Sequence, residues 1–196
     1  MIKIVSKKKN FIVCVAVVFF CVTVNLVLQT VGLFSGLTEN ENLAIAIVSI
    51  SMIFSFCILP YFGMRKLFDI ERIPISPKLA IRTLGEIFFV FVVGFAGAKL
   101  DFCTVFYYVT IGFCEEFLFR KLILDYLEEY SCKFFAYVSD ALLFAFLIHI
   151  NCNLLDNLLF RFPLGICLVF VKKKVGFPEA CSLHAFYDIM LCTDIL

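Results

Sequence analysis

The chain has 196 residues, of which 63% are hydrophobic and 17% are charged, and its mean hydropathy is +1.03. Soluble domains have about 45–50% apolar and about 25% charged residues, so this composition excludes a soluble fold, which would lack the polar surface to cover its core. The formal net charge of +1 excludes the basic surface that nucleic-acid binding needs. We therefore expect membrane lipid, and no nucleic acid, among its partners.

Seven apolar stretches are candidates for helices that cross a membrane, which requires about 20 apolar residues for about 30 Å of hydrocarbon. The third, sixth and last are short or contain a charged residue, namely Glu86, Arg161 and Asp188. Only helices or closed barrels satisfy the backbone in lipid. The sequence therefore predicts an all-α fold, a polytopic membrane helical bundle with about seven transmembrane helices, at residues 11–33, 43–63, 83–99, 103–124, 134–151, 157–171 and 179–196.

The first stretch, which begins at Phe11, follows Lys7, Lys8 and Lys9 as a signal peptide would. It is longer than the apolar region of a signal peptide and lacks a clear small-residue cleavage site. We expect it to remain as an uncleaved first span.

The basic residues lie mainly in alternate loops, and cytoplasmic loops carry the excess of lysine and arginine. This pattern predicts a multi-pass protein of the cell membrane with a cytoplasmic N-terminus and an external C-terminus. Lys99 and Arg161 fall on the external side, as does the acidic segment 38–42. The residues predicted to face the cytoplasm are Lys3, Lys7, Lys8, Lys9, Arg65, Lys66, Arg72, Lys78, Arg82, Lys121, Lys133, Lys172, Lys173 and Lys174.

The chain contains no internal repeat and no low-complexity linker. The segment 69–78, with Pro74 and Pro77, is the one plausible joint and does not separate two domains, so we predict a single membrane domain over residues 1–196. The ten cysteines lie scattered, many in apolar runs, without a CxxC pair, which favours reduced thiols over a disulfide framework or a zinc site.

The fourth stretch contains three ionisable residues, Glu115, Glu116 and Arg120. Glu115 lies about 13 Å from the end of the predicted helix, and a charge at the membrane centre costs roughly 3 kcal/mol or more. Glu116 and Arg120 are four residues apart and can pair on one helix face, whereas Glu115 points about 100° away. An unpaired carboxyl in an apolar site suits a general base, although a structural ion network is the alternative interpretation.

The two histidines, His149 and His184, both lie in apolar stretches instead of loops. A single histidine in such a stretch is more often a hydrogen-bonded core residue, but two beside a buried carboxylate favour a site. Asp188 follows His184 by one helical turn, so both project to one side of the last helix. Imidazole can transfer a proton near neutral pH or donate a hydrogen bond to a developing oxyanion.

Three ordered motifs contain these residues. Residues 115–120 (EEFLFR) match EExxxR, residues 144–149 (FAFLIH) resemble FxxxH, and residues 184–188 (HAFYD) match HxxxN/D. In this order they resemble the CPBP family of intramembrane proteases, which includes CAAX prenyl endopeptidases and bacteriocin-processing or self-immunity proteins. The resemblance covers roughly residues 103–196, which would be the CPBP-like catalytic core.

The resemblance implies an intramembrane endopeptidase that hydrolyses a peptide bond of a membrane-associated or lipidated substrate. Glu115 with His149 would activate a water molecule, His184 with Asp188 would stabilise the oxyanion, and Glu116 and Arg120 would give structural support. The family has been described both as metal-free and as metal-dependent. We favour no cofactor and no metal site, with zinc held by Glu115, His149 and His184 as the alternative.

Three features depart from the family pattern. Residue 188 is Asp where many relatives have Asn, and an ionised Asp cannot donate a hydrogen bond to an oxyanion. The phenylalanines lie three and five residues before His149, so the second motif is out of register by one. A helix running outward from residue 134 would place His149 near the external surface, away from Glu115, unless residues 125–138 lie along the membrane and the span starts later.

Two other functions remain open from the sequence. A catalytically relaxed immunity or scaffold protein with the same fold would keep the helices and lose the chemistry. A small transporter or proton relay would use the carboxylates and histidines as an ion path.

Overall fold

The computed structural model describes residues 7–34, 41–68, 77–150 and 152–193, and every regular element in these ranges is a helix. Consecutive elements join into seven continuous helices, which confirms the predicted bundle of about seven. Five of them contain a π-helical segment, labelled η, in which hydrogen bonds run from residue i to residue i+5. The seven are α1 (Lys7–Phe34); α2 (Glu41–Met52), η2 (Ile53–Ile58) and α3 (Leu59–Phe68); α4 (Pro77–Val92) and η3 (Val93–Gly97); α5 (Phe102–Glu116), η4 (Phe117–Ile123) and α6 (Leu124–Tyr130); α7 (Lys133–Leu143) and η5 (Phe144–Ile148); α8 (Leu154–Asp156), η6 (Asn157–Arg161) and α9 (Phe162–Lys174); and α10 (Phe177–Cys192).

Five of the described helices are long and apolar enough to cross a membrane, namely Lys8–Gly32, Glu41–Lys66, Pro77–Gly97, Phe102–Tyr130 and Leu154–Lys174. The other two, α7 with η5 and α10, are shorter than a full span. Of the connections predicted from sequence, the external segment 38–42 and the joint 69–78 lie mostly outside the described residues.

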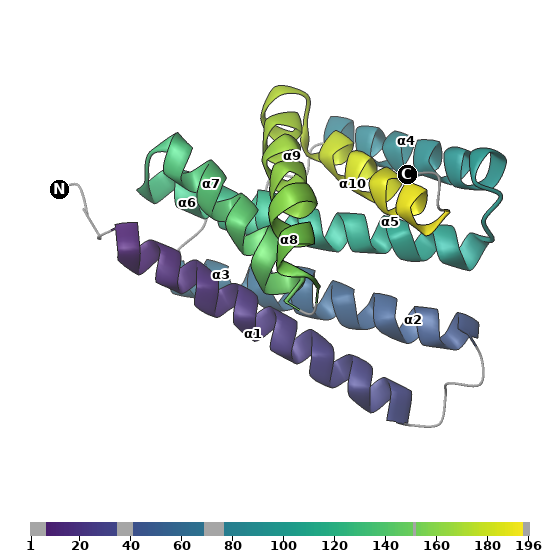
Figure 1. Ribbon diagram of the computed structural model, residues 1–196, viewed down its shortest axis with the longest axis horizontal. Helices are drawn as coiled ribbons and strands as arrows, with labels where there is room; N and C mark the ends of the chain where they lie inside the picture. Colours follow the sequence, from purple (N-terminus) through teal and green to yellow (C-terminus); the bar gives the residue numbers. More distant parts are fainter. Residues whose placement is uncertain (1–6, 35–40, 69–76, 151, 194–196) are drawn as a thin grey trace.

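Helix α5 lies at the centre of the bundle (Figure 1). It packs against α2 on one side and against α4 and α10 on the other, while α1 and α2 run antiparallel along one edge. Helix α9 crosses the other helices steeply and contacts α7 and α10. The second half of the chain therefore surrounds α5 and its continuation η4 with α7, α9 and α10.

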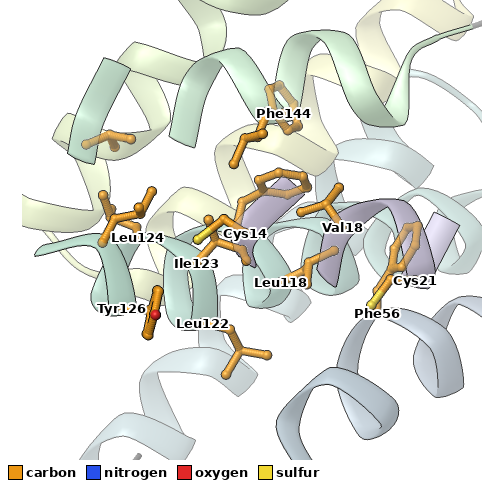
Figure 2. Packing of buried hydrophobic residues seen from close by; sticks show 14 of the residues in the cluster. Cys14, Val18, Cys21, Phe56, Leu118, Leu122, Ile123, Leu124, Tyr126 and Phe144 are labelled. Atoms are coloured by element: carbon orange, nitrogen blue, oxygen red, sulfur yellow. The ribbon is translucent and has the colours of Figure 1, made fainter. Parts of the chain in front are cut away.

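The main hydrophobic core joins α1, η4, α6 and η5 (Figure 2). Cys14 and Val18 of α1 contribute to it together with Leu118 and Ile123 of η4, and all four are fully buried. Large apolar side chains also cover the outside of the bundle, where a soluble protein would place polar groups. We interpret this exposed surface as the face in contact with lipid; it includes Phe19, Phe34, Phe62, Phe88, Phe134 and Phe160.

Helix α5 begins at an N-cap. The Asp101 side chain accepts hydrogen bonds from the Thr104 amide at 3.1 Å and from the Thr104 hydroxyl at 2.5 Å. These bonds stabilise the charged carboxylate and lower the pKa of Asp101. The cap fixes where the central helix starts, and thus the depth of every side chain along it.

At the opposite end of the bundle, a glycine turn leads from α9 into α10. Gly176 has a φ of +158°, and a Cβ there would overlap the Glu179 carboxylate and lie 2.8 Å from Nη2 of Arg82. Arg82 forms an ion pair with Glu179 and donates a hydrogen bond to the Val175 carbonyl at 3.1 Å. The turn is thereby held to the start of α4.

Helices α5 and α10 approach each other closely at Gly112. A Cβ at this position would lie 2.9 Å from the Ala185 amide nitrogen and 3.0 Å from the Cys181 carbonyl oxygen. Small residues permit such close packing of membrane helices.

We predict that Gly112→Ala destabilises the protein by about 1–3 kcal/mol, because the added methyl group must push α10 away from α5. The measurement is thermal unfolding in detergent. Gly85→Ala is the matched control, since a Cβ there meets nothing within 4 Å; it should be neutral or slightly stabilising. Equal effects of the two variants would contradict the close-packing argument.

Candidate active site

One open pocket, with a volume of about 270 Å³, contains all four residues that the sequence predicts as catalytic. Glu115 reaches it from α5, His149 from the end of η5, and His184 and Asp188 from α10. Tyr107, Tyr108 and Ile111, all from α5, complete the lining. Three helical segments that are distant in sequence thus bring two carboxylates, Glu115 and Asp188, and both histidines of the chain around one pocket.

His184 lies between the carboxylates. Its Nδ1 atom is 3.0 Å from Oε1 of Glu116, and its Nε2 atom is 3.7 Å from both Oε2 of Glu115 and Oδ2 of Asp188. The side chain is almost completely buried. The contact with Glu116 fixes the ring so that Nε2 faces the pocket.

Glu116 is itself held by a buried ion network. Its Oε2 atom is 3.1 Å from Nε of Arg120, and Nη1 of Arg120 donates to Oδ2 of Asp140 at 2.6 Å. All three side chains have 0% exposure. The predicted pair of Glu116 and Arg120 is present, and Asp140 of α7 extends it to a third helix.

Asp140 is not among the site residues predicted from the sequence, although a signal was present. Asp140 is a carboxylate inside the apolar stretch 134–151, and the cost of burying a charge in a membrane marks it as it marked Glu115. No motif includes it. A buried carboxylate on a neighbouring helix is the expected partner for a guanidinium that already faces one acid.

Glu115 differs from Glu116 in its surroundings, as the angle between adjacent helical residues predicts. Its side chain is 6% exposed, and Oε2 accepts no hydrogen bond from the described residues. This oxygen lies at the pocket, near Nε2 of His184. Glu115 is therefore placed to accept a hydrogen bond, and then a proton, from a water molecule in the pocket.

The predicted separation of His149 from Glu115 is wrong, because both residues line the same pocket. The helix of α7 (11 residues) and η5 (5 residues) is only about 24 Å long, shorter than a membrane core. It begins at Lys133, so the span does not start later, and it ends before His149 instead of continuing to residue 151. The early end of this helix leaves His149 inside the bundle.

The π-helical segment η5 accounts for the irregular spacing of the second motif. A π-helical turn contains about one residue more than an α-helical turn. Phe144, five residues before His149, therefore stays close to it, and their rings meet edge to face with centroids 5.5 Å apart. The same phenyl ring is 5.4 Å from the His184 ring and 4.9 Å from Cζ of Arg120. Phe144 thus contacts both histidines and packs on the guanidinium.

Segment η6 supports the backbone at His149. The Asn157 side chain donates to the His149 carbonyl at 2.9 Å and accepts from Arg161 Nη1 at 3.1 Å. The Cys152 amide donates to the same carbonyl at 3.0 Å. Neither Asn157 nor Arg161 was predicted as a site residue; their signal, polar side chains in an apolar stretch, resembles that of Asp140.

The zinc alternative requires three side chains that converge on one point. Among the described residues, no three His, Cys, Asp or Glu side chains converge closely enough to hold a metal ion. Glu115, His149 and His184 share the pocket without forming such a ligand set. The metal-free interpretation stays a prediction.

None of the ten cysteines, all of which lie in the described ranges, forms a disulfide in the structure.

Comparison with known proteins gives one match. Residues 97–190, just under half of the chain, match the model of the family described as type II CAAX prenyl endopeptidase Rce1-like. This region is similar to that protease family. The resemblance to CPBP intramembrane proteases is thereby confirmed, and the Rce1-like region contains Glu115, His149, His184 and Asp188. No curated protein and no solved structure matches the chain at a significant level.

We predict that Asp140→Ala lowers the free energy of unfolding by about 3–5 kcal/mol, because it leaves the buried Arg120 with one carboxylate instead of two. The matched control is Glu128→Ala, which removes the partner of Lys173 from a partly exposed ion pair and should cost about 0–1 kcal/mol. Thermal or denaturant unfolding in detergent measures both. A small effect at Asp140 would contradict a structural role of the network.

Proposed function

We propose that the protein is an intramembrane endopeptidase that uses a water molecule activated by Glu115 and His149. One observation carries this proposal. A carboxylate oxygen of Glu115 that accepts no hydrogen bond from the part of the chain that the structure describes meets two imidazoles around a single pocket. The family of the Rce1-like region, a protease family, supports the same reaction.

In this mechanism, Glu115 accepts a proton from the water while the water oxygen attacks the carbonyl carbon of the scissile bond. The carbonyl oxygen gains a negative charge. His184 acts here as an imidazolium, in which Nδ1–H is bound to Glu116 and Nε2–H donates the hydrogen bond that stabilises this charge. The tetrahedral intermediate then collapses, the C–N bond breaks, and the proton held by Glu115 passes to the leaving amine. One water is consumed and one acid and one amine are released.

The surrounding residues orient these groups without touching the reacting atoms. Glu116 holds Nδ1 of His184, Arg120 pairs with Glu116, and Asp140 holds Arg120. An ionised Asp188 can accept but cannot donate a hydrogen bond, so we assign it the orientation of His184 instead of direct stabilisation of the oxyanion.

For the substrate, we propose a membrane-associated peptide or a lipidated protein. The printed name of the matching family, a CAAX prenyl endopeptidase, supports a prenylated protein as one member of this class. A site inside a helical bundle also favours a substrate that is already held at the membrane.

We predict that Glu115→Gln lowers peptide cleavage by at least about 100-fold, because an amide cannot accept the proton from water. Cleavage of a quenched fluorescent peptide by purified protein in detergent measures it. Glu86→Gln is the matched control, since Glu86 lies on α4 outside this pocket, and it should retain activity. Full activity of Glu115→Gln would contradict the proposal.

A second prediction concerns the metal. We expect cleavage by purified protein to continue at an unchanged rate after dialysis against a strong zinc chelator. Loss of activity that is restored by added Zn²⁺ would favour the alternative in which Glu115, His149 and His184 bind the ion.

A further inference from the structure

Arg161 is an arginine inside a helix that is long and apolar enough to cross the membrane. It lies in η6, about 10 Å along the helix from Leu154, where the span Leu154–Lys174 begins. Ionisable side chains within such spans are costly, and they either pair with one another or mark the path of a substrate or ion. The surroundings of Arg161 therefore decide between these roles.

Arg161 differs from two other arginines of the bundle in its partners. Arg120 pairs with two carboxylates and Arg82 with one. Within the described residues, Arg161 forms no ion pair, and its one hydrogen bond runs from Nη1 to Oδ1 of Asn157 at 3.1 Å. A guanidinium has five N–H donors, so most of those of Arg161 have no partner in this part of the chain.

The charge of Arg161 acts on the candidate active site. It interacts electrostatically with His149 and Asp188, which line the pocket, and with Tyr187, the neighbour of Asp188 on α10. Two hydrogen bonds through Asn157 also join Arg161 to the His149 carbonyl. The guanidinium therefore lies beside the pocket, near the side that His149 and Asp188 line.

An unmodified peptide that enters this pocket carries only carboxylates as its stable anions at neutral pH. Its C-terminus and its Asp and Glu side chains present two oxygens in one plane, which a guanidinium binds through two parallel hydrogen bonds. A lipid phosphate fits less well, because His149 and Asp188, with which Arg161 interacts, line the pocket instead of the lipid-facing surface.

We propose that Arg161 binds a carboxylate of the substrate, either at the C-terminus or on an Asp or Glu side chain, while the scissile bond lies at Glu115. This inference rests on the proposed function, which makes the ligand a peptide. The substrate carboxylate supplies the acidic partner that Arg161 lacks among the described residues. Arg161 is then a specificity-determining residue, which selects acidic peptides over neutral ones.

The test uses a positional-scanning set of quenched fluorescent peptides that differ only in their carboxylates. Each peptide is made with a C-terminal carboxylate or amide, and with Glu or Gln at each position in turn. For the wild-type protein in detergent, we expect kcat/KM of the best carboxylate peptide to exceed that of its neutral counterpart at least about 10-fold. The acid and amide ends identify a terminal carboxylate, and Glu against Gln identifies a side chain. Equal values in every pair overturn the proposal.

Arg161→Gln should reduce this ratio to about 1, because an amide side chain cannot form the charged pair. Arg82→Gln is the matched control, since it removes an arginine that pairs with Glu179 outside the pocket, and it should keep the ratio. A ratio that persists in Arg161→Gln, or that is lost equally in Arg82→Gln, overturns the proposal.

Arg161→Lys decides the question if Arg161→Gln does not fold. A lysine keeps the charge but binds a carboxylate as a single point charge, so the ratio should fall at least about 3-fold. An unchanged ratio in Arg161→Lys overturns the proposal.

Binding separates this inference from the proposed function. Fluorescence anisotropy measures the affinity of the same peptides for Glu115→Gln in detergent and requires no cleavage. The carboxylate peptide should bind at least about 10-fold more tightly than its neutral counterpart, and the added substitution Arg161→Gln should remove the difference. Absence of cleavage by the wild type overturns the proposed protease, whereas equal binding of the two peptides overturns carboxylate binding at Arg161.

Discussion

A buried chain of charges, from Asp140 through Arg120 and Glu116 to His184, is the interaction on which the rest of the site depends. A guanidinium without exposure, inside a bundle surrounded by lipid, must be paired on more than one side. The two carboxylates that pair with Arg120 come from different helices: Asp140 lies on α7 and Glu116 on α5. Glu116 also contacts His184 of a third helix, α10. These contacts join α5 with η4, α7 and α10 at a single depth.

The same chain of charges determines which carboxylate faces the pocket. Because Glu116 is engaged by Arg120 and His184, the adjacent Glu115 is the carboxylate that faces the pocket. Two neighbouring acids therefore have different roles, one in holding the bundle and one at the site. The division follows from the angle between successive residues on a helix.

Much of this arrangement could be predicted from the sequence. Hydropathy located seven helices, and the spacing of four residues identified the pair of Glu116 and Arg120. The cost of a charge in lipid selected Glu115, and the scarcity of histidine selected His149 and His184. The structure brings these residues to one pocket, and their catalytic roles stay predictions. Each argument depends on one element at a time, or on a spacing within it.

The features that were missed depend on contacts between elements. Hydropathy does not show that the helix of α7 and η5 ends inside the bundle, because His149 and the residues after it are followed by more apolar sequence. Asp140 carries no motif, and its role becomes visible only when Arg120 of another helix lies beside it. The support of His149 by Asn157 is likewise a contact across a turn.

The widened helical turn at η5 has a consequence for how such proteins are recognised. Phe144 and His149 meet although one more residue separates them than the pattern FxxxH allows, because the backbone between them winds more loosely. The loose winding brings together two rings that are five positions apart, where an α-helical turn brings together residues three or four apart. A pattern search that requires three residues between the two rings would therefore not find this pair.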